Sequence, residues 1–273
     1  MKGQPHKGGQ RQGGNQSAKK PSTSSWGGVA DWYKESLQKD DTYQQKVILP
    51  NVLRLLDVKP GMSVLDIGCG EGFFSRAIAE KGANVLGVDI SQELIMAAED
   101  QTVPGSQYSV ASSEKIEIAP DDTFDAAIIV LALQNIKDLD GTFKEAARVL
   151  KPNGALVMIL NHPAFRIPKS SSWVWDEGLK AFGRRVDRYM SEQEIPIDMH
   201  PGERGAKSLT VSFHRPMQVY VKALVKHGFA IAGMEEWISH KASQAGMRAQ
   251  AEDTARKEFP LFLMMKAVKI MGE

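Results

Sequence analysis

The sequence has little that would suit a secreted or membrane protein. It contains one cysteine, Cys69, so an intramolecular disulfide and a cysteine-based metal site are both excluded. It has no signal-peptide core, and no apolar run of the roughly 18 residues that a membrane-spanning helix needs. We therefore expect a soluble, cytoplasmic protein that uses no metal and does not bind a membrane.

A strong excess of charge is also absent. The chain has 34 Lys and Arg against 33 Asp and Glu, so overall charge favours neither nucleic acid nor a membrane as partner. Residues 1–25 are the exception, because they carry basic residues, no acid and few apolar side chains. We predict a disordered basic tail there. It is either a solvated, dispensable segment, which we favour, or an arm that touches RNA or an acidic partner.

The rest of the chain predicts an α/β fold. At 273 residues and 42% hydrophobic composition, it can form one large domain. Helical pieces are expected within residues 26–60, over 28–33, 43–50 and 51–56. Strand-like and helix-like runs then alternate, which predicts a doubly wound parallel sheet. Strands are expected over 62–67, 84–89, 107–111, 126–131, 155–160, 229–237 and 259–268, and helices over 72–82, 91–98, 138–151 and from Pro216 to Gly228.

The alternation stops between Asn161 and Arg215. This interval is rich in proline and aromatic residues, and two alternating stretches, 184–190 and 208–214, are predicted to pair as an antiparallel hairpin. We expect residues 161–215 to be an inserted cap, residues 26–60 to form lid helices, and residues 61–273 to form the core. Aromatic residues of the insertion either wall a substrate pocket or form a small core of their own; these are Phe165, Trp173, Trp175 and Tyr189.

Residues 64–72 carry the most informative motif, V-L-D-I-G-C-G-E-G. It reads as a strand that ends in Asp66, followed by a turn with Gly68, Gly70 and Gly72, and then a helix. Such a turn lets backbone N–H groups approach a ligand at the carboxyl edge of the sheet. The next predicted strand ends in Asp89, whose carboxylate can accept hydrogen bonds from two ribose hydroxyls. The two features together predict a site for a nucleoside-type cofactor.

The glycine spacing indicates which cofactor. Dinucleotide sites use G-x-G-x-x-G, whereas here the third glycine comes one residue earlier and Phe73 stands in its place. Glu71 would also repel a diphosphate. The motif resembles the first motif of class I S-adenosylmethionine-dependent methyltransferases, strand-D-x-G-x-G-x-G. With V-D-I-S at 88–91, F-D-A-A at 124–127 and L-K-P-N-G at 150–154, it is most similar to the ubiquinone-pathway and other small-molecule branch. A nicotinamide or flavin site is the alternative.

The resemblance implies a fold, a cofactor and a set of contacts. The fold would be a Rossmann-like sheet of seven strands, with the seventh antiparallel between the fifth and sixth, and the cofactor S-adenosyl-L-methionine. Asp66 would orient the amino acid end of the cofactor, the three glycines would let the backbone pass close to it, and Asp89 would hold the ribose. The remaining implied cofactor contacts are Ile90 against adenine, Leu131 beside the methionine end, and Ser112 with Ser113 where the family often has an acid.

Two histidines are the candidate bases. Methyl transfer needs alignment of the acceptor, exclusion of water and, for a protonated acceptor, a base. His162 follows the fifth strand and His214 ends the insertion, so both are expected at the carboxyl edge of the sheet. His200, His227 and His240 are weaker candidates. Cys69 belongs to the glycine turn, which excludes the cysteine mechanism of cytosine-C5 methylation.

The sequence thus predicts methyl transfer to oxygen, nitrogen or carbon of a small molecule. Two alternatives stay open. One is an RNA- or protein-directed methyltransferase that uses the basic tail, so that nucleic acid is a possible but not favoured partner. The other is a module that binds S-adenosylmethionine without catalysis. The residue pattern does not identify the acceptor, the accepting atom or the oligomeric state.

Overall fold

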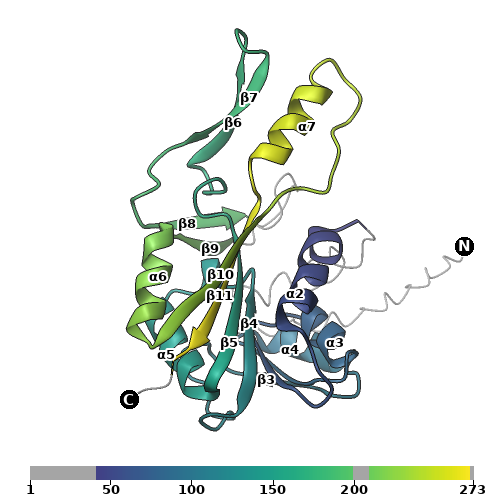
Figure 1. Ribbon diagram of the computed structural model, residues 1–273, viewed down its shortest axis with the longest axis vertical. Helices are drawn as coiled ribbons and strands as arrows, with labels where there is room; N and C mark the ends of the chain where they lie inside the picture. Colours follow the sequence, from purple (N-terminus) through teal and green to yellow (C-terminus); the bar gives the residue numbers. More distant parts are fainter. Residues whose placement is uncertain (1–40, 199–208, 271–273) are drawn as a thin grey trace, which may run out of the picture.

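The structure, a computed structural model, describes residues 41–198 and 209–270 (Figure 1). Its centre is a seven-stranded sheet in the order β10-β11-β5-β4-β1-β2-β3. Strand β11 pairs antiparallel with both β5 and β10, and the other pairs in the sheet are parallel. The predicted seventh strand is therefore confirmed. The sheet strands are β1 (Ser63–Ile67), β2 (Asn84–Asp89), β3 (Ser106–Val110), β4 (Phe124–Val130), β5 (Leu150–Asn161), β10 (Phe229–Trp237) and β11 (Phe262–Lys269).

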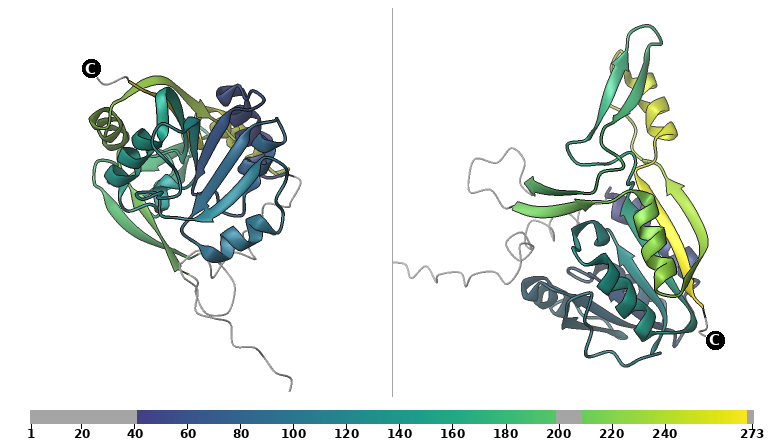
Figure 2. Two further views of the ribbon diagram at one scale, coloured as in Figure 1. Left: turned by 90° about the horizontal axis from the view of Figure 1, so that it is seen from below. Right: turned by 90° about the vertical axis from the view of Figure 1, so that its left-hand side faces the viewer.

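Helices cover both faces of the sheet (Figures 1 and 2). Alternate residues of the central strands enter two separate cores, as a strand with both faces buried requires. Leu65 packs with α5 and α6 on one face, whereas its neighbour Val64 packs with α2 and α3 on the other. The helices are η2 (Gln44–Ile48), α2 (Leu49–Leu56), α3 (Phe73–Ala79), α4 (Gln92–Glu99), η3 (Leu133–Asn135), α5 (Leu139–Val149), α6 (Met217–Lys226) and α7 (Ala249–Glu258).

Several element boundaries differ from the predictions. The two helical pieces expected around Pro50 run on without a break, because proline near the start of α2 costs no helical hydrogen bond. The predicted gap between the helix over 138–151 and the strand over 155–160 is instead part of β5, where the register with β4 shifts. Helix α7 was not predicted, because only Ala255 of its residues is buried and it shows no apolar stripe. Ser91 caps α4 as expected.

The predicted hairpin of the insertion is wrong. Residues 184–190 and 208–214 do not pair with each other. Instead β7 (Ala181–Val186) pairs with β6 (Ser171–Asp176), and β9 (Leu209–His214) pairs with β8 (Gln193–Asp198). Each strand pairs with one that is adjacent to it in the order of strands along the chain, which costs less loop-closure entropy than the predicted pairing across a longer loop. The insertion is therefore two separate hairpins.

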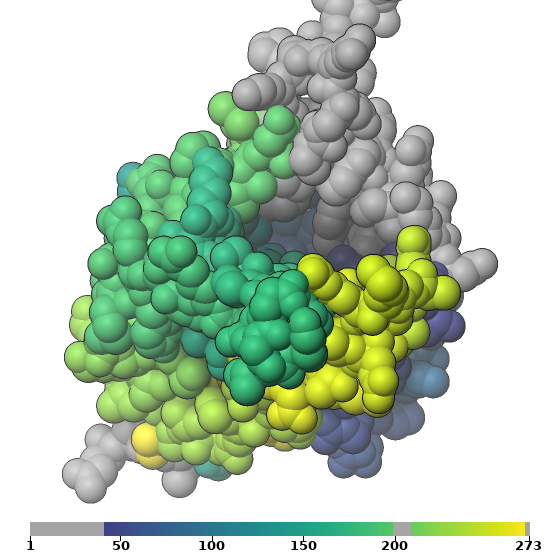
Figure 3. Space-filling model, turned by 90° about the horizontal axis from the view of Figure 1, so that it is seen from above, coloured from purple at the N-terminus to yellow at the C-terminus, as the bar shows by residue number. Residues whose placement is uncertain are grey.

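The two hairpins occupy different places. β6–β7 stands away from the body together with α7, at the top of Figure 1, and Figure 3 shows these two elements side by side. β8–β9 lies across the carboxyl edge of the sheet, and β9 contacts η3. The predicted tail at 1–25, the helix expected at 28–33 and His200 lie outside the described residues. None of the described helices is long and apolar enough to cross a membrane.

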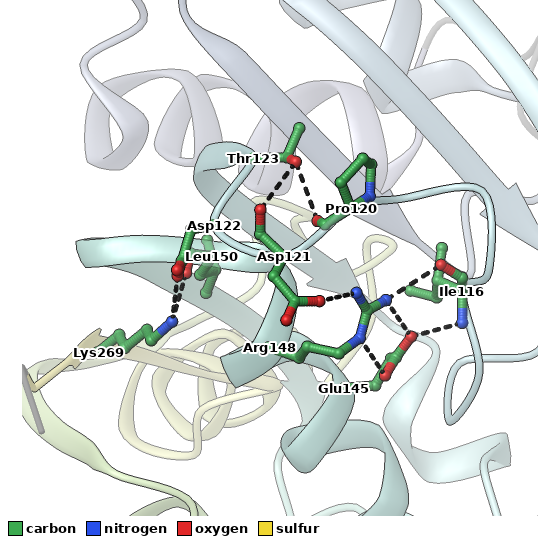
Figure 4. A network of polar contacts seen from close by, with 9 residues as sticks. All are labelled: Ile116, Pro120, Asp121, Asp122, Thr123, Glu145, Arg148, Leu150 and Lys269. Carbon is green, nitrogen blue, oxygen red and sulfur yellow. Dashed lines mark hydrogen bonds and ion pairs between the residues drawn. The ribbon is translucent and has the colours of Figure 1, made fainter.

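A network of charged side chains ties elements together at the opposite, amino edge of the sheet (Figure 4). Arg148 of α5 donates hydrogen bonds to Glu145, to Asp121 and to the Ile116 carbonyl. Close by, Lys269 at the end of β11 bonds to Asp122 and to the carbonyl of Leu150. Glu145 and Asp121 raise the pKa of Arg148, and Arg148 lowers the pKa of Glu145. This edge is held together by paired charges.

Candidate active site

The glycine turn between β1 and α3 forms one wall of a cavity. Gly68 has a left-handed backbone, with φ of +74°, and a Cβ there would lie 2.6 Å from Cβ of Ala132. Only glycine therefore lets the turn pass this close to the end of β4. Gly68 and Gly70 line the cavity, whereas Gly72 does not. Gly72 caps α3 with a φ of +83°, and a Cβ there would meet the ring of Tyr108.

We call this space the loop cavity; its volume is about 610 Å³. That volume is in the range of sites that bind small molecules and cofactors. Its walls come from the turn, from the ends of β2, β3 and β4, and from β9. The lining residues are Gly68, Gly70, Asp89, Ile90, Leu94, Ala111, Ser113, Glu114, Val130, Leu131, Ala132, Asn135, Ile136, Lys137, Asp138, Thr210, Val211 and Phe213.

Asp66 lies beneath the turn and is not among the residues that line the loop cavity. Its side chain is buried, and the Ser75 hydroxyl donates a hydrogen bond to Oδ2 at 2.6 Å. Burial raises the pKa of this carboxyl to about 7; the Ser75 hydrogen bond opposes the rise, and the Asp89 charge adds to it. Any effect of Asp66 on the amino acid end of a cofactor would therefore be indirect, through α3, whose Ser75 is bonded to it.

Asp89 lines the loop cavity at the end of β2, where the motif placed it. Its Oδ2 accepts from the Gly70 amide at 3.0 Å, and its Oδ1 accepts from the Ser91 amide at 2.9 Å. The carboxylate thus holds the glycine turn and has further lone pairs for hydroxyl donors. Burial raises its pKa. Next to it, Ile90 lines the cavity with 56% of its surface exposed, an apolar face without a protein partner to cover it.

Of the two serines that follow β3, only Ser113 lies at the loop cavity. Ser113 lines the loop cavity, and its hydroxyl lies 2.9 Å from the Thr142 hydroxyl. Ser112 does not line it and instead forms a bridge with Lys115. Sequence reasoning missed Glu114 and Asp138, two acids that line the same part of the cavity. Glu114 directly follows the two serines, so the acid expected at this strand end is displaced along the chain rather than lost.

Leu131 joins the loop cavity to a second cavity. It adopts an uncommon left-handed backbone, with φ of +54°, where the chain turns sharply at the end of β4. Leu131, Asn135, Thr210 and Phe213 line both cavities. The second, which we call the insertion cavity, has a volume of about 240 Å³. Its walls come from η2, the end of β4 with η3, the segment after β5, and the β8–β9 hairpin with the start of α6.

His162 lies outside both cavities. Its side chain is only 2% exposed, and Nε2 is 2.7 Å from Oε1 of Glu236. Nδ1 accepts from the amides of Ala164 and Phe165 at 3.2 and 3.4 Å. Burial lowers the pKa of the ring, so the neutral form, with its proton on Nε2, satisfies every contact. These contacts support a role in holding the start of the insertion against β10.

His214 lines the insertion cavity. Its Nε2 lies 2.8 Å from the Tyr189 carbonyl oxygen and must therefore be the protonated nitrogen. Burial lowers the pKa of the ring, so the neutral form prevails at pH 7. Nδ1 then keeps its lone pair, and among residues 41–198 and 209–270 no hydrogen-bond partner is seen for it. His214 thus combines a position at the cavity wall with an available basic nitrogen.

The other histidines and the insertion aromatics belong elsewhere. His227 bonds to Asp140 and His240 to Asp41, both at exposed acids and away from either cavity. Three of the aromatic side chains, Phe165, Trp173 and Trp175, form a cluster of edge-on contacts with Phe182 and Phe259. None of these five rings lines the loop or insertion cavity; Trp175, Phe182 and Phe259 instead line a third cavity, beside α7.

Comparison with known proteins identifies the family. Residues 65–158 match the model of a methyltransferase domain. The structure resembles that of an S-adenosylmethionine-dependent methyltransferase from Mesorhizobium loti, with a TM-score of 0.63 and 30% identity; the match covers 80% of this chain and 96% of that one. The chain belongs to the S-adenosylmethionine-dependent methyltransferases. A methyltransferase structure from Listeria monocytogenes is similar, with 28% identity and a TM-score of 0.63, over 81% of this chain and 96% of that one.

Curated relatives of this methyltransferase match over shorter stretches. A demethylmenaquinone methyltransferase of Tropheryma whipplei is 36% identical over 111 residues, 40% of this chain and 46% of the relative. A ubiquinone biosynthesis O-methyltransferase of Bradyrhizobium diazoefficiens is 35% identical over 109 residues, 39% of this chain and 42% of the relative. The chain thus spans less than half the length of these relatives.

The loop cavity fits S-adenosyl-L-methionine, the cofactor of this family. Gly68 and Gly70 line it without side chains, Asp89 offers carboxylate oxygens to a ribose, and Ile90 offers an exposed apolar surface to an adenine. The acids Glu114 and Asp138 are available to an amino group. None of these groups requires a diphosphate, which agrees with the glycine spacing. The predicted resemblance to the methyltransferases is confirmed.

Proposed function

We propose that this protein transfers a methyl group from S-adenosylmethionine to a small-molecule acceptor in the insertion cavity. The observation that carries the proposal is the junction of the two cavities at Leu131, Asn135, Thr210 and Phe213. A donor in the loop cavity and an acceptor in the insertion cavity would meet at these four residues. A volume of about 240 Å³ suits a small organic molecule rather than a folded macromolecule.

The relatives support an acceptor related to quinone precursors. Their names describe methylation of demethylmenaquinone in one case and an O-methylation in ubiquinone biosynthesis in the other. The matched stretches cover 40% and 39% of this chain, and the insertion supplies much of the acceptor wall here. We therefore assign the acceptor class, a small organic molecule methylated on oxygen, nitrogen or carbon, and leave its atom to experiment.

The chain's contribution to the reaction is alignment, shielding and a base. S-adenosylmethionine supplies a methyl group that its positively charged sulfur already activates. The turn and Asp89 would hold this donor, while Leu131 and Phe213 would exclude water where the cavities join. We assign the role of general base to His214, whose neutral ring can accept a proton at Nδ1 while Nε2 stays bonded to Tyr189.

The β8–β9 hairpin acts in this proposal as the cap that we predicted for residues 161–215. Ile197 of β8 and five consecutive positions of β9, from Thr210 to His214, line one or both cavities. From the other side, Gln44 of η2 lines the insertion cavity, which supports a lid role for the described part of residues 26–60. β6 and β7 contribute no residue to either cavity, so that hairpin is not part of the cap.

Methyl-labelled donor tests the proposal. The protein is incubated with labelled S-adenosylmethionine and an extract divided into small molecules, RNA and protein, and each fraction is counted. We expect label among the small molecules, from which mass spectrometry identifies the acceptor. Label confined to RNA or protein would replace the proposal with the macromolecular alternative. Tight donor binding without label in any fraction would indicate a non-catalytic binding module.

A further inference from the structure

The insertion cavity has a one-sided charge. Two arginines line it, Arg166 and Arg215, and none of its described lining residues is an acid. The loop cavity differs, because Asp89, Glu114 and Asp138 all line it. The insertion as a whole contains several acids, so the absence of carboxylates is a property of this cavity and not of the segment.

Arg215 contributes charge but has few free donors. It is 6% exposed, and its guanidinium donates to the carbonyls of Leu133, Ile136 and Lys137 at distances of 2.7–3.4 Å. These bonds fix the chain that follows Leu131. Arg215 is thus a structural arginine whose charge remains near the cavity.

Arg166 is different, because most of its donors have no hydrogen-bond acceptor among the residues that the structure describes. Its side chain donates one hydrogen bond, from Nη1 to Oδ1 of Asn161 at 2.8 Å, and its guanidinium lies 5.6 Å from the centre of the Phe262 ring. No carboxylate of the described residues lies within ion-pair distance of it. A guanidinium offers five N–H donors, so four remain. Burying a cation without an anion is costly, which makes this side chain a binding site for one.

We propose that Arg166 binds an oxyanion of the acceptor, so that the enzyme methylates small organic acids that carry a carboxylate or phosphate group. This rests on the proposed function, since it assigns the insertion cavity to the acceptor. Arginine's planar fork matches either oxyanion with two parallel, charge-assisted hydrogen bonds. Phe262 beneath the guanidinium keeps the fork in place.

The first experiment tests two questions separately: whether the protein methylates a small molecule, and whether that molecule is an anion. The labelled small molecules are passed over an anion-exchange resin at neutral pH. We expect the label to be retained. Label that passes through unretained, in neutral or cationic molecules, would overturn the Arg166 assignment and leave the proposed function intact. No label among small molecules at all would overturn the proposed function itself.

The second experiment tests the residue with the acceptor so identified. Arg166→Gln should raise the KM for that acceptor at least about tenfold, with donor affinity unchanged, and Arg166→Lys should recover part of the loss. Arg185→Gln is the matched control, because Arg185 is exposed on β7 and lines neither the loop nor the insertion cavity. Equal KM values for Arg166→Gln, Arg185→Gln and the unchanged protein would contradict the proposal.

A measurement on the unchanged protein covers the case in which Arg166→Gln does not fold. The methyl ester of the identified acid keeps its shape and loses its charge. We expect the ester to have at least about a tenfold higher KM than the acid, since a charge-assisted pair is replaced by a neutral contact. An ester that is used as well as the acid would rule out recognition of the anion.

Discussion

The two edges of the central sheet place arginines in opposite surroundings. At the amino edge, Arg148 has two carboxylates and a carbonyl as partners, although 31% of its side chain is exposed. At the carboxyl edge, Arg166 is more deeply covered and has one amide oxygen and an aromatic ring. Arg148, which stabilises the fold, is paired with carboxylates of the protein itself. We propose that a cation at a cavity wall without such partners, as Arg166 is among the described residues, receives its anion from a ligand.

The same contrast holds for the carboxylates. Burial raises the pKa of Asp66 and Asp89 at the carboxyl edge, whereas Arg148 lowers the pKa of Glu145 at the amino edge. The buried carboxyl groups at the carboxyl edge thus lower the stability of the folded state at neutral pH. The paired carboxylate at the amino edge raises it. Substitutions at the two edges should therefore change different measurements.

The largest expected effect is on turnover. His214→Gln should lower kcat by about a hundredfold, the low end for loss of a general base. Because burial holds the pKa of His214 below 6.5, kcat/KM of the unchanged protein should fall as pH drops through that lowered value. This acid limb should be missing from the variant's pH profile.

His162→Gln is the comparison for this variant. Both ring nitrogens of His162 have partners, so we expect a lower thermal stability and an acid limb that is retained. If instead the limb disappears in His162→Gln and persists in His214→Gln, the assignment of the base is reversed.

Donor binding gives the next largest effect. Asp89→Ala should weaken S-adenosylmethionine binding at least about tenfold, because a charged acceptor for hydroxyl donors is lost and the Gly70 amide loses its partner. Titration calorimetry measures this directly. Asp121→Ala, at the other edge, should leave the affinity unchanged. An Asp89→Ala protein that binds the donor normally would remove Asp89 from the site.

Asp66 should make stability depend on pH in the unusual direction. Its pKa is about 7 in the folded protein against 3.8 for the ordinary value, so between these values the folded state holds a proton that the unfolded state has released. Stability should then fall as pH rises from about 4 to 7, by up to about 1.4 kcal/mol for each pH step of one in that interval. Asp66→Asn should abolish this slope and melt higher than the unchanged protein at pH 8 without donor.

The smallest effect is expected at the amino edge. Arg148→Met should cost about 1–2 kcal/mol of unfolding free energy, reduced from a buried value because water reaches the pair. The folded pKa of Glu145 is lowered, so its contribution is complete above about 4.5 and is lost as pH falls through the lower, folded value. Urea unfolding at pH 7 and pH 4 measures both. Donor affinity should not change; if it does, the two edges are coupled.

The sheet could be predicted almost completely from the sequence, because its signals are local. β1, β2 and β4 are continuous apolar runs, and the glycine turn needs left-handed backbone at Gly68, which only the residue type reveals. The placement of β11 between β5 and β10 came from the family resemblance, because strand order depends on contacts across many residues. Asp89 at the end of β2 needed no tertiary information either.

The acceptor side could not be predicted, because segments distant in the chain form it. Gln44, Leu131, Arg166 and His214 line one cavity although more than a hundred residues separate the first from the last. The hydrogen bonds of the two histidines also depend on packing. Both ring nitrogens of His162 have partners, one of them Glu236 of β10, whereas only Nε2 of His214 has a partner among the described residues, the Tyr189 carbonyl. Both histidines look alike in the chain.

Local order of residues was therefore enough to establish the family, the donor motif and the run of alternating strands and helices. Backbone conformation and strand formation depend mainly on residues that are close in sequence, so the sequence alone predicts them. The tertiary structure determined how the insertion strands pair. It also determined that Arg166 has no carboxylate partner among the described residues, and that His214 lines a cavity whereas His162 does not. Each of these depends on which distant group supplies, or fails to supply, a partner for a buried polar atom.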